Sequence, residues 1–170
     1  TVAVIGHSAN DSLVMLGNYH GDPSSEPVTP LAAINAAAQH VVYAKGCWVT
    51  GEGTWDFPAA IEAARKADVA VLFVGGSAKG TVDGTTYFDT TEKEGLDRTD
   101  IALPSVQADM IKAIAAQTDT PIVLVLVNGG PLAIEWAVAS PRVEAILEAF
   151  YPGQRGGNAI ADALFGRFSP

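Results

Sequence analysis

The sequence has one cysteine, few basic residues and no long apolar run, and each shortage excludes a class of protein. Cys47 is the only cysteine among 170 residues, so no disulfide can form within the chain. Ten Lys and Arg against 19 Asp and Glu give a formal net charge of −9, with no basic run. Binding to a phosphate backbone needs clustered Lys and Arg, so we expect no nucleic acid and no anionic membrane as partners. No apolar stretch reaches the roughly 20 residues that cross a bilayer.

The residues that usually hold metals or cofactors are also missing. His7, His20 and His40 are far apart, and no Cys or carboxylate joins them at metal-ligand spacing. Gly51-Glu52-Gly53 and Gly75-Gly76 lack the full glycine fingerprint between a strand and a helix. We therefore expect no metal, no nucleotide and no other cofactor. Cys47 has no base beside it in sequence, and we interpret it as a small buried side chain.

Apolar runs of strand length alternate with helical patterns along the chain. Apolar residues make up 48% and charged residues 17%, which is typical of one globular domain with its own core. Such alternation indicates βαβ units around a mostly parallel sheet. The sequence predicts an α/β three-layer sandwich with five to six strands and helices on both faces. The expected strands are 1–6, 41–44, 69–74, 121–127 and 143–150, and the expected helices are 31–39, 59–67, one from 103–105 onward, 132–138 and 158–165.

Every long loop leaves the carboxyl end of a predicted strand. These loops cover 7–27, 46–56, 75–102 and 128–131. Open parallel sheets bind ligands beyond the carboxyl ends of their strands. We therefore expect one edge of this domain to be its contact edge.

The 75–102 loop is the most unusual segment, because it is long, shows almost no apolar periodicity and reads as structureless. Loops of this length in compact domains usually have a function. Acidic residues crowd its far end against only two basic ones: Asp89, Glu92, Glu94, Asp97 and Asp100 face Lys93 and Arg98. A carboxyl among other carboxylates has a raised pKa and can remain protonated, as a general acid requires. On this chemistry alone, Glu94 is either a proton donor or a solvated loop carboxylate.

Seven motifs in order resemble the C-terminal α/β sandwich domain of family 3 glycoside hydrolases, the β-xylosidase and β-glucosidase family. They cover nearly the whole chain. The motifs are Val2 to Gly6, Leu16 to Gly21 with Thr29-Pro30-Leu31, Tyr43 to Cys47, Ala67 to Val71, Glu94-Gly95-Leu96-Asp97-Arg98 with Leu103-Pro104, Val127 to Pro131, and Tyr151 to Ala161 with Leu164-Phe165-Gly166.

The resemblance implies retaining exo-hydrolysis of O-glycosyl bonds in a β-linked oligosaccharide or an aryl glycoside. In the family, a TIM-barrel domain supplies an aspartate nucleophile and this domain supplies the acid/base glutamate. The matching position, first in Glu-Gly-x-Asp-Arg, is Glu94. The two carboxyl groups must lie about 5–5.5 Å apart across the bond. The expected partner is therefore an N-terminal TIM-barrel domain of the same enzyme.

The resemblance also predicts what lies outside residues 1–170. The chain is interpreted as an excised C-terminal domain without the barrel and without the family's last strand, so we expect the isolated fragment to be inactive. Secretion and a role in xylan degradation are expected from the family. The loop 77–90 is longer than the link typical of the xylosidase-like branch, which leaves xylose and glucose both open as the sugar.

Other residues of the loops have two interpretations each. Glu92 is the second candidate donor, although an extended segment would point it differently from Glu94. Asp97 and Arg98 either bind sugar hydroxyls or, as we favour, fix the loop. Aromatic side chains that could stack on a sugar or pack between domains are Tyr87, Phe88, Trp48 and Trp55, while Trp136 is expected in the core. Two rival functions remain: a non-catalytic carbohydrate-binding or assembly module, and a flavodoxin-like nucleotide domain.

Overall fold

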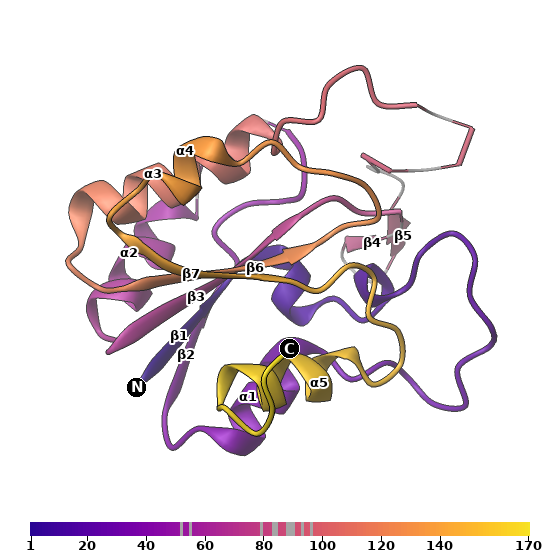
Figure 1. Ribbon diagram of the computed structural model, residues 1–170, viewed down its shortest axis with the longest axis horizontal. Coiled ribbons are helices and arrows are strands. Elements are labelled where there is room, and N and C mark those ends of the chain that lie inside the picture. Colours follow the sequence, from indigo (N-terminus) through magenta and orange to yellow (C-terminus); the bar gives the residue numbers. More distant parts are fainter. Residues whose placement is uncertain are drawn as a thin grey trace.

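A computed structural model shows one sheet with helices on both faces (Figure 1). It describes residues 1–170 except 52, 55, 79, 83, 84, 88–90, 93 and 96, and it describes only the backbone of 80–82 and 85–87. Within the described residues, no helix has the length and apolar character needed to span a membrane.

The central sheet has five strands, all parallel, in the order β2-β1-β3-β6-β7. This confirms the α/β prediction, because all five expected apolar runs form strands. The inner strands are apolar on both faces, as a parallel sheet covered by helices requires. The strands are β1 Val2–Ile5, β2 Val41–Ala44, β3 Val69–Gly75, β6 Ile122–Val127 and β7 Val143–Glu148.

Alternate residues of the strands supply two separate cores, one on each face of the sheet. On one face, Leu72 and Leu124 pack against α2 Phe57–Arg65, α3 Ser105–Gln117 and α4 Glu135–Val138. On the other face, Phe73 and Val125 pack against α1 Pro30–Ala37 and α5 Gly156–Leu164. Figure 1 shows these two groups of helices on opposite sides of the strands. Two short 3-10 helices, η1 His7–Asn10 and η2 Leu13–Met15, follow β1.

Helix α1 begins where its sequence predicts. The Thr29 hydroxyl oxygen accepts a hydrogen bond from the backbone N–H of Ala32, and Pro30 occupies the first helical position. Such a cap satisfies one of the free N–H groups at a helix start. In contrast, α5 begins at Gly156 rather than at the expected 158, because the N–H of Ala159 already bonds to the Arg155 carbonyl.

The long acidic loop is not structureless, which corrects the sequence-based expectation. It contains a small antiparallel pair, β4 Gly80–Val82 and β5 Thr85–Tyr87. Three-residue strands carry too few side chains for a periodic pattern, so the apolar alternation that identifies longer strands is missing. The described loops that follow β3, β6 and β7 meet at the carboxyl edge of the sheet, which we call the rim (Figure 1).

Candidate acid/base site at the sheet rim

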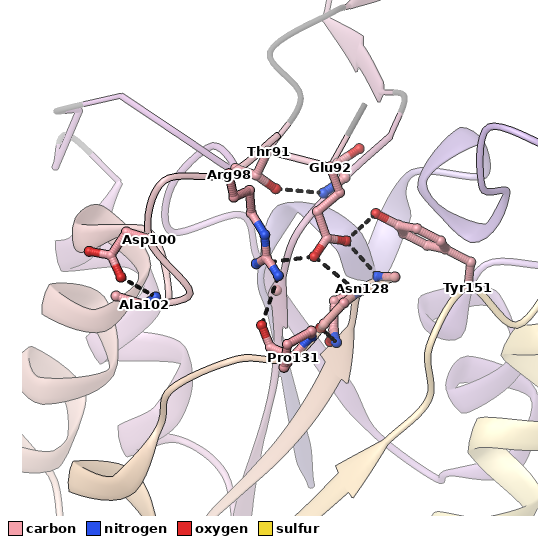
Figure 2. Close-up of polar contacts among 12 residues, drawn as sticks. Thr91, Glu92, Arg98, Asp100, Ala102, Asn128, Pro131 and Tyr151 are labelled. Carbon is pink, nitrogen blue, oxygen red and sulfur yellow. Dashed lines mark hydrogen bonds and ion pairs between the residues drawn. The ribbon is translucent and has the colours of Figure 1, made fainter. Parts of the chain in front are cut away.

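A buried carboxylate, Glu92, lies at the centre of the rim and is surrounded by hydrogen-bond donors (Figure 2). Its Oε2 accepts from the Gly129 N–H at 2.5 Å and from the Tyr151 hydroxyl at 2.6 Å. Its Oε1 accepts from the Gly130 N–H at 3.3 Å and lies 3.2 Å from Nη1 of Arg98. Only 7% of the Glu92 side chain is exposed. Consecutive backbone N–H groups and a guanidinium together compensate a buried negative charge.

Three glycines leave the space that the Glu92 and Arg98 side chains occupy. A Cβ on Gly76 would lie 2.4 Å from the Glu92 Cδ. A Cβ on Gly130 would lie 2.7 Å from Nη2 of Arg98, and one on Gly129 would lie 2.8 Å from the Tyr151 ring. Real Cβ atoms do not approach this closely, so a side chain at any of these positions would displace Glu92, Arg98 or Tyr151 from its present place.

Tyr151 reaches Glu92 from the loop that follows β7. Burial, the hydrogen bond to Glu92 and the Glu92 charge raise the pKa of Tyr151, so its hydroxyl stays protonated as a donor. The preceding residue, Phe150, has a φ of 52°. This left-handed conformation is unfavourable for a bulky residue, and it turns the chain from β7 toward the rim.

Glu94 has the opposite environment, since it is exposed although only two residues separate it from Glu92. A hydrogen bond from the Tyr19 hydroxyl to the Glu94 carboxyl raises the pKa of Tyr19. Tyr19 itself is 78% exposed. The following Gly95 has a φ of 76°, a left-handed conformation that glycine adopts without strain. Glu94 is thus a carboxyl group that projects from the rim with an exposed phenol beside it.

Of the two other predicted loop residues, Arg98 is fixed by its contacts and Asp97 is exposed. Besides its pair with Glu92, Arg98 donates from Nη2 to the Pro131 carbonyl at 2.8 Å, so it joins two rim loops. Asp97 is exposed and, with Arg98, lines a hollow of about 410 Å³. Asp100 lies on the same loop, where its Oδ1 accepts from the Ala102 N–H (Figure 2).

The aromatic candidates do not gather around Glu94 in the part of the chain that the structure describes. Trp48 packs edge-on against the His7 ring at 5.0 Å, and the Lys45 ammonium lies 3.7 Å above the Trp48 ring. Trp136 is half-buried and packs against the core, as predicted. Trp55, Phe88 and the side chain of Tyr87 lie outside the described residues, as do Glu52, Asp89 and Lys93. Among the residues described, no three His, Cys, Asp or Glu are arranged to hold a metal ion.

The sequence did not identify the partners of Glu92. Gly129-Gly130 and Tyr151 enter the sequence analysis only as parts of two motifs of the family resemblance. One available signal was the pair of adjacent glycines directly after the most apolar strand, because consecutive free N–H groups at a strand end form an anion-binding concavity. Tyr151 gave no such signal, since 59 residues separate it from Glu92.

Comparison with known proteins identifies the family of this chain. The sequence model described as "Glycosyl hydrolase family 3 C-terminal domain" matches residues 1–170. Beta-D-xylosidase 1 of Arabidopsis thaliana is 39% identical over 170 residues, which cover 100% of this chain and 20% of that protein. The exo-1,4-beta-xylosidase of Aspergillus awamori is 36% identical over 171 residues, again covering 100% of this chain and 20% of that protein.

Solved structures show the same fold. A GH3 exo-beta-xylosidase in complex with a xylobiose aziridine activity-based probe has a TM-score of 0.84 and 32% identity, covering 98% of this chain and 20% of that one. The GH3 beta-glucosidase of Bifidobacterium adolescentis has a TM-score of 0.79 and 31% identity, and the match covers 99% of this chain and 23% of that one. The chain therefore spans about a fifth of the length of the proteins that it matches.

Proposed function

Because this chain belongs to the family of glycosyl hydrolase family 3 C-terminal domains, we propose that Glu94 is the acid/base residue of a retaining exo-β-glycosidase. The observation that carries the proposal is the contrast between two neighbouring carboxylates. Glu92 is enclosed by four donors, whereas Glu94 is exposed at the rim and has an exposed tyrosine, Tyr19, as its hydrogen-bond donor. A proton donor must reach the leaving oxygen, and only Glu94 of the two is placed to do so.

The proposed reaction needs a second carboxylate that attacks the anomeric carbon. Retaining enzymes place the two carboxyl groups about 5–5.5 Å apart. We propose that an N-terminal TIM-barrel domain of the same enzyme supplies this nucleophile as an aspartate and holds the sugar. In the first step Glu94 gives its proton to the leaving oxygen, and a covalent glycosyl-enzyme forms. In the second step the Glu94 carboxylate takes a proton from the water that releases the sugar.

The substrate that we propose is a β-linked oligosaccharide or an aryl β-glycoside, cleaved from its non-reducing end. Curated relatives that are xylosidases, at 36–39% identity, support a β-xyloside, and the solved beta-glucosidase leaves a β-glucoside as the second candidate. Action on xylan fragments by a secreted enzyme is part of the same proposal. The rates of the full-length protein on matched aryl xylosides and glucosides decide between the two sugars.

The experiment compares Glu94→Gln with the parent in the full-length protein that carries this chain. We expect kcat/KM for xylobiose or cellobiose to fall about 10²–10⁴-fold, the usual contribution of a general acid. For the matching 2,4-dinitrophenyl glycoside, kcat/KM should change little, because that leaving group departs without a proton. Azide should accelerate breakdown of the glycosyl-enzyme by attacking its anomeric carbon, and the product should be a glycosyl azide of retained configuration.

Asp100→Asn is the matched control, because it makes the same chemical change on the same exposed loop. Asp100→Asn should hydrolyse both substrates with kcat/KM values near those of the parent. If Glu94→Gln loses the same factor on both substrates and azide has no effect, Glu94 is not the donor. If Glu94→Gln behaves like Asp100→Asn, the chain acts by contact only, as a carbohydrate-binding or assembly module would.

A further inference from the structure

We propose that Glu92 is a positioning residue: it seats the loop that presents Glu94 and takes no part in proton transfer itself. The inference rests on the proposed function of Glu94. It gives a role to Glu92, whose burial and donors the assignment of Glu94 as proton donor does not explain. Its basis is the geometry around Glu92, which joins three segments of the rim.

Three of the four contacts of Glu92 come from segments that are distant in sequence. Gly129 and Gly130 belong to the turn after β6, and Tyr151 follows β7. Arg98 lies at the far end of the acidic loop and is itself bound to the Pro131 carbonyl. Figure 2 shows these groups converging on one carboxylate. The turn after β6 and the loop after β7 therefore hold the acidic loop at Glu92. Arg98 pairs with Glu92 from the far end of the same loop.

Burial makes this arrangement far more restrictive than a surface ion pair. Exposed pairs such as Glu62 with Lys66 on α2 contribute little and break easily, since water replaces either partner. The Glu92 side chain is 7% exposed and Arg98 19%, so water cannot substitute for a lost donor there. Removing one member of a buried pair leaves the other uncompensated. Glu92 consequently has one favoured position.

The backbone on each side of this carboxylate is held as well. The N–H of Glu92 bonds to the Ser77 carbonyl, and the amide of Asn18 donates to the Glu92 carbonyl at 3.3 Å. The hydroxyl of Thr91 accepts from the Ser77 N–H at 3.1 Å. Two residues of chain span at most about 7 Å. Fixing Glu92 therefore limits how far the Glu94 backbone can move from its place over the rim.

Backbone strain next to Tyr151 indicates that the contact with Glu92 is functionally constrained. Phe150 holds a φ of 52° while its side chain is 59% exposed, so it fills no core position in return. Non-glycine residues in this region are strained and cluster at sites where the surrounding structure fixes them. Here the turn at Phe150 brings the hydroxyl of Tyr151 to Glu92.

The test is Glu92→Gln in the full-length protein, measured on substrates with poor and good leaving groups. The amide keeps the side-chain length but removes the charge and offers one acceptor oxygen to four donors. We expect kcat/KM for the disaccharide to fall about 10–100-fold, because a displacement of about 1 Å in a catalytic group has such an effect. The dinitrophenyl glycoside should stay within about threefold, and azide should give no acceleration, because the Glu94 carboxylate is still present.

Two further measurements separate positioning from a general loss of structure. Tyr151→Phe removes one donor and keeps the ring, so it should show the same substrate dependence with a loss of about tenfold or less. Hydrogen exchange of peptides that cover 91–98 should be faster in Glu92→Gln than in Asp100→Asn, whatever the activity. If Glu92→Gln does not fold, Tyr151→Phe carries the test.

If kcat/KM of Glu92→Gln falls equally for the disaccharide and the dinitrophenyl glycoside, or falls for neither, the positioning role is overturned. Unchanged hydrogen exchange in 91–98 overturns it too. The proposed function fails separately, through Glu94→Gln: if that variant shows no dependence on the leaving group, Glu94 is not the donor. The exchange result for Glu92→Gln then still reports whether this carboxylate seats the loop.

Discussion

At the scale of single residues, the chain places chemically identical groups in opposite surroundings. Glu92 and Glu94 lie two positions apart, yet one is enclosed by donors and the other projects into solvent. Gly129, Gly130, Tyr151 and Arg98 surround the Glu92 carboxylate with donors, whereas Glu94 lies outside this cluster. Neighbouring carboxylates of one acidic cluster can therefore have very different surroundings.

Cys47 gives a residue-scale prediction about pH. Burial, and next the Asp56 carboxylate, raise the pKa of the Cys47 thiol from its ordinary value of 9.0 to about 12. The folded state therefore keeps the proton that the unfolded state releases. The resulting stabilisation is fully present below pH 9 and is lost as the pH rises from 9 toward 12.

The measurement is iodoacetamide labelling of Cys47 in the folded full-length protein, followed by peptide mass spectrometry. Because the thiolate is the reactive form, Cys47 should label far more slowly at pH 8 than the same peptide after unfolding. Cys47→Ala should remove this residue's contribution to the alkaline loss of stability. Labelling of the native protein at the rate of the unfolded peptide contradicts the prediction.

The motif around Glu94 could be identified from the sequence, but its support could not. Glu-Gly-x-Asp-Arg is local, so a single stretch of sequence contains it. Three of the four donors to Glu92 are 37, 38 and 59 residues away, and only the packing of β6 and β7 beside β3 brings them together. Long-range hydrogen bonds leave no periodic pattern that a sequence could show.

At the scale of elements, a buried glutamine joins a helix to the end of a strand. Gln107 of α3 is 4% exposed, and its amide makes three hydrogen bonds of 2.7–2.8 Å. It accepts from the Gly75 N–H and donates to the carbonyls of Gly75 and Val49. These bonds satisfy backbone groups at the point where β3 ends and its neighbours can no longer pair with them.

Gln107→Met tests this link, because it preserves the volume and removes all three hydrogen bonds. Each buried backbone group left without a partner costs about 1–3 kcal/mol. We expect native-state hydrogen exchange in β3 and in 47–50 to report a free energy of opening lowered by about 2–4 kcal/mol. Gln117→Met, at an exposed position of the same helix, is the control. It should change the free energy of opening by less than about 0.5 kcal/mol. Equal effects of the two variants would show that the amide has no such role.

The main elements were predictable because they are long enough for their patterns to be read. Strands 69–74 and 121–127 are continuous apolar runs, and Thr29-Pro30 marks a helix start. The β4–β5 pair escaped prediction because its strands have three residues each. The start of α5 was placed two residues late, since Gly156 and Gly157 read as a break rather than as helix. Both are buried and packed closely in the structure, where a Cβ on Gly157 would lie 2.4 Å from the Val28 carbonyl oxygen.

At the scale of the whole molecule, the site does not lie where doubly wound sheets usually bind ligands. The strand order reverses between β1 and β3, and such a switch point normally forms the binding crevice. Here His7, Trp48 and Gln107 line the space beyond these strands and leave no room in it for a water molecule. The Glu92 and Glu94 loop lies instead over the ends of β3, β6 and β7. This filled crevice argues against the flavodoxin-like alternative.

A whole-molecule prediction follows from the proposal that a second domain holds the sugar against the rim. In the full-length protein, a sugar lactone that mimics the flattened ring should slow carbodiimide labelling of Glu94. Glu62 and Asp109 are exposed on α2 and α3, away from the rim, and should label at unchanged rates. Peptide mass spectrometry gives all three rates in one experiment. Labelling of Glu94 that saturating lactone leaves unaltered is incompatible with a sugar held against the rim.

The contact between Glu92 and Tyr151 has a consequence for biosynthesis. Ribosomes make the acidic loop first, and 59 residues must still be added before the tyrosine that secures it exists. Chains fold from the amino end during translation, so the sheet can begin to assemble while the acidic loop is still held by fewer contacts. Until Tyr151 has been added, Glu92 lacks its hydroxyl donor, and the final position of the loop is reached only after the segment that follows β7 has been made.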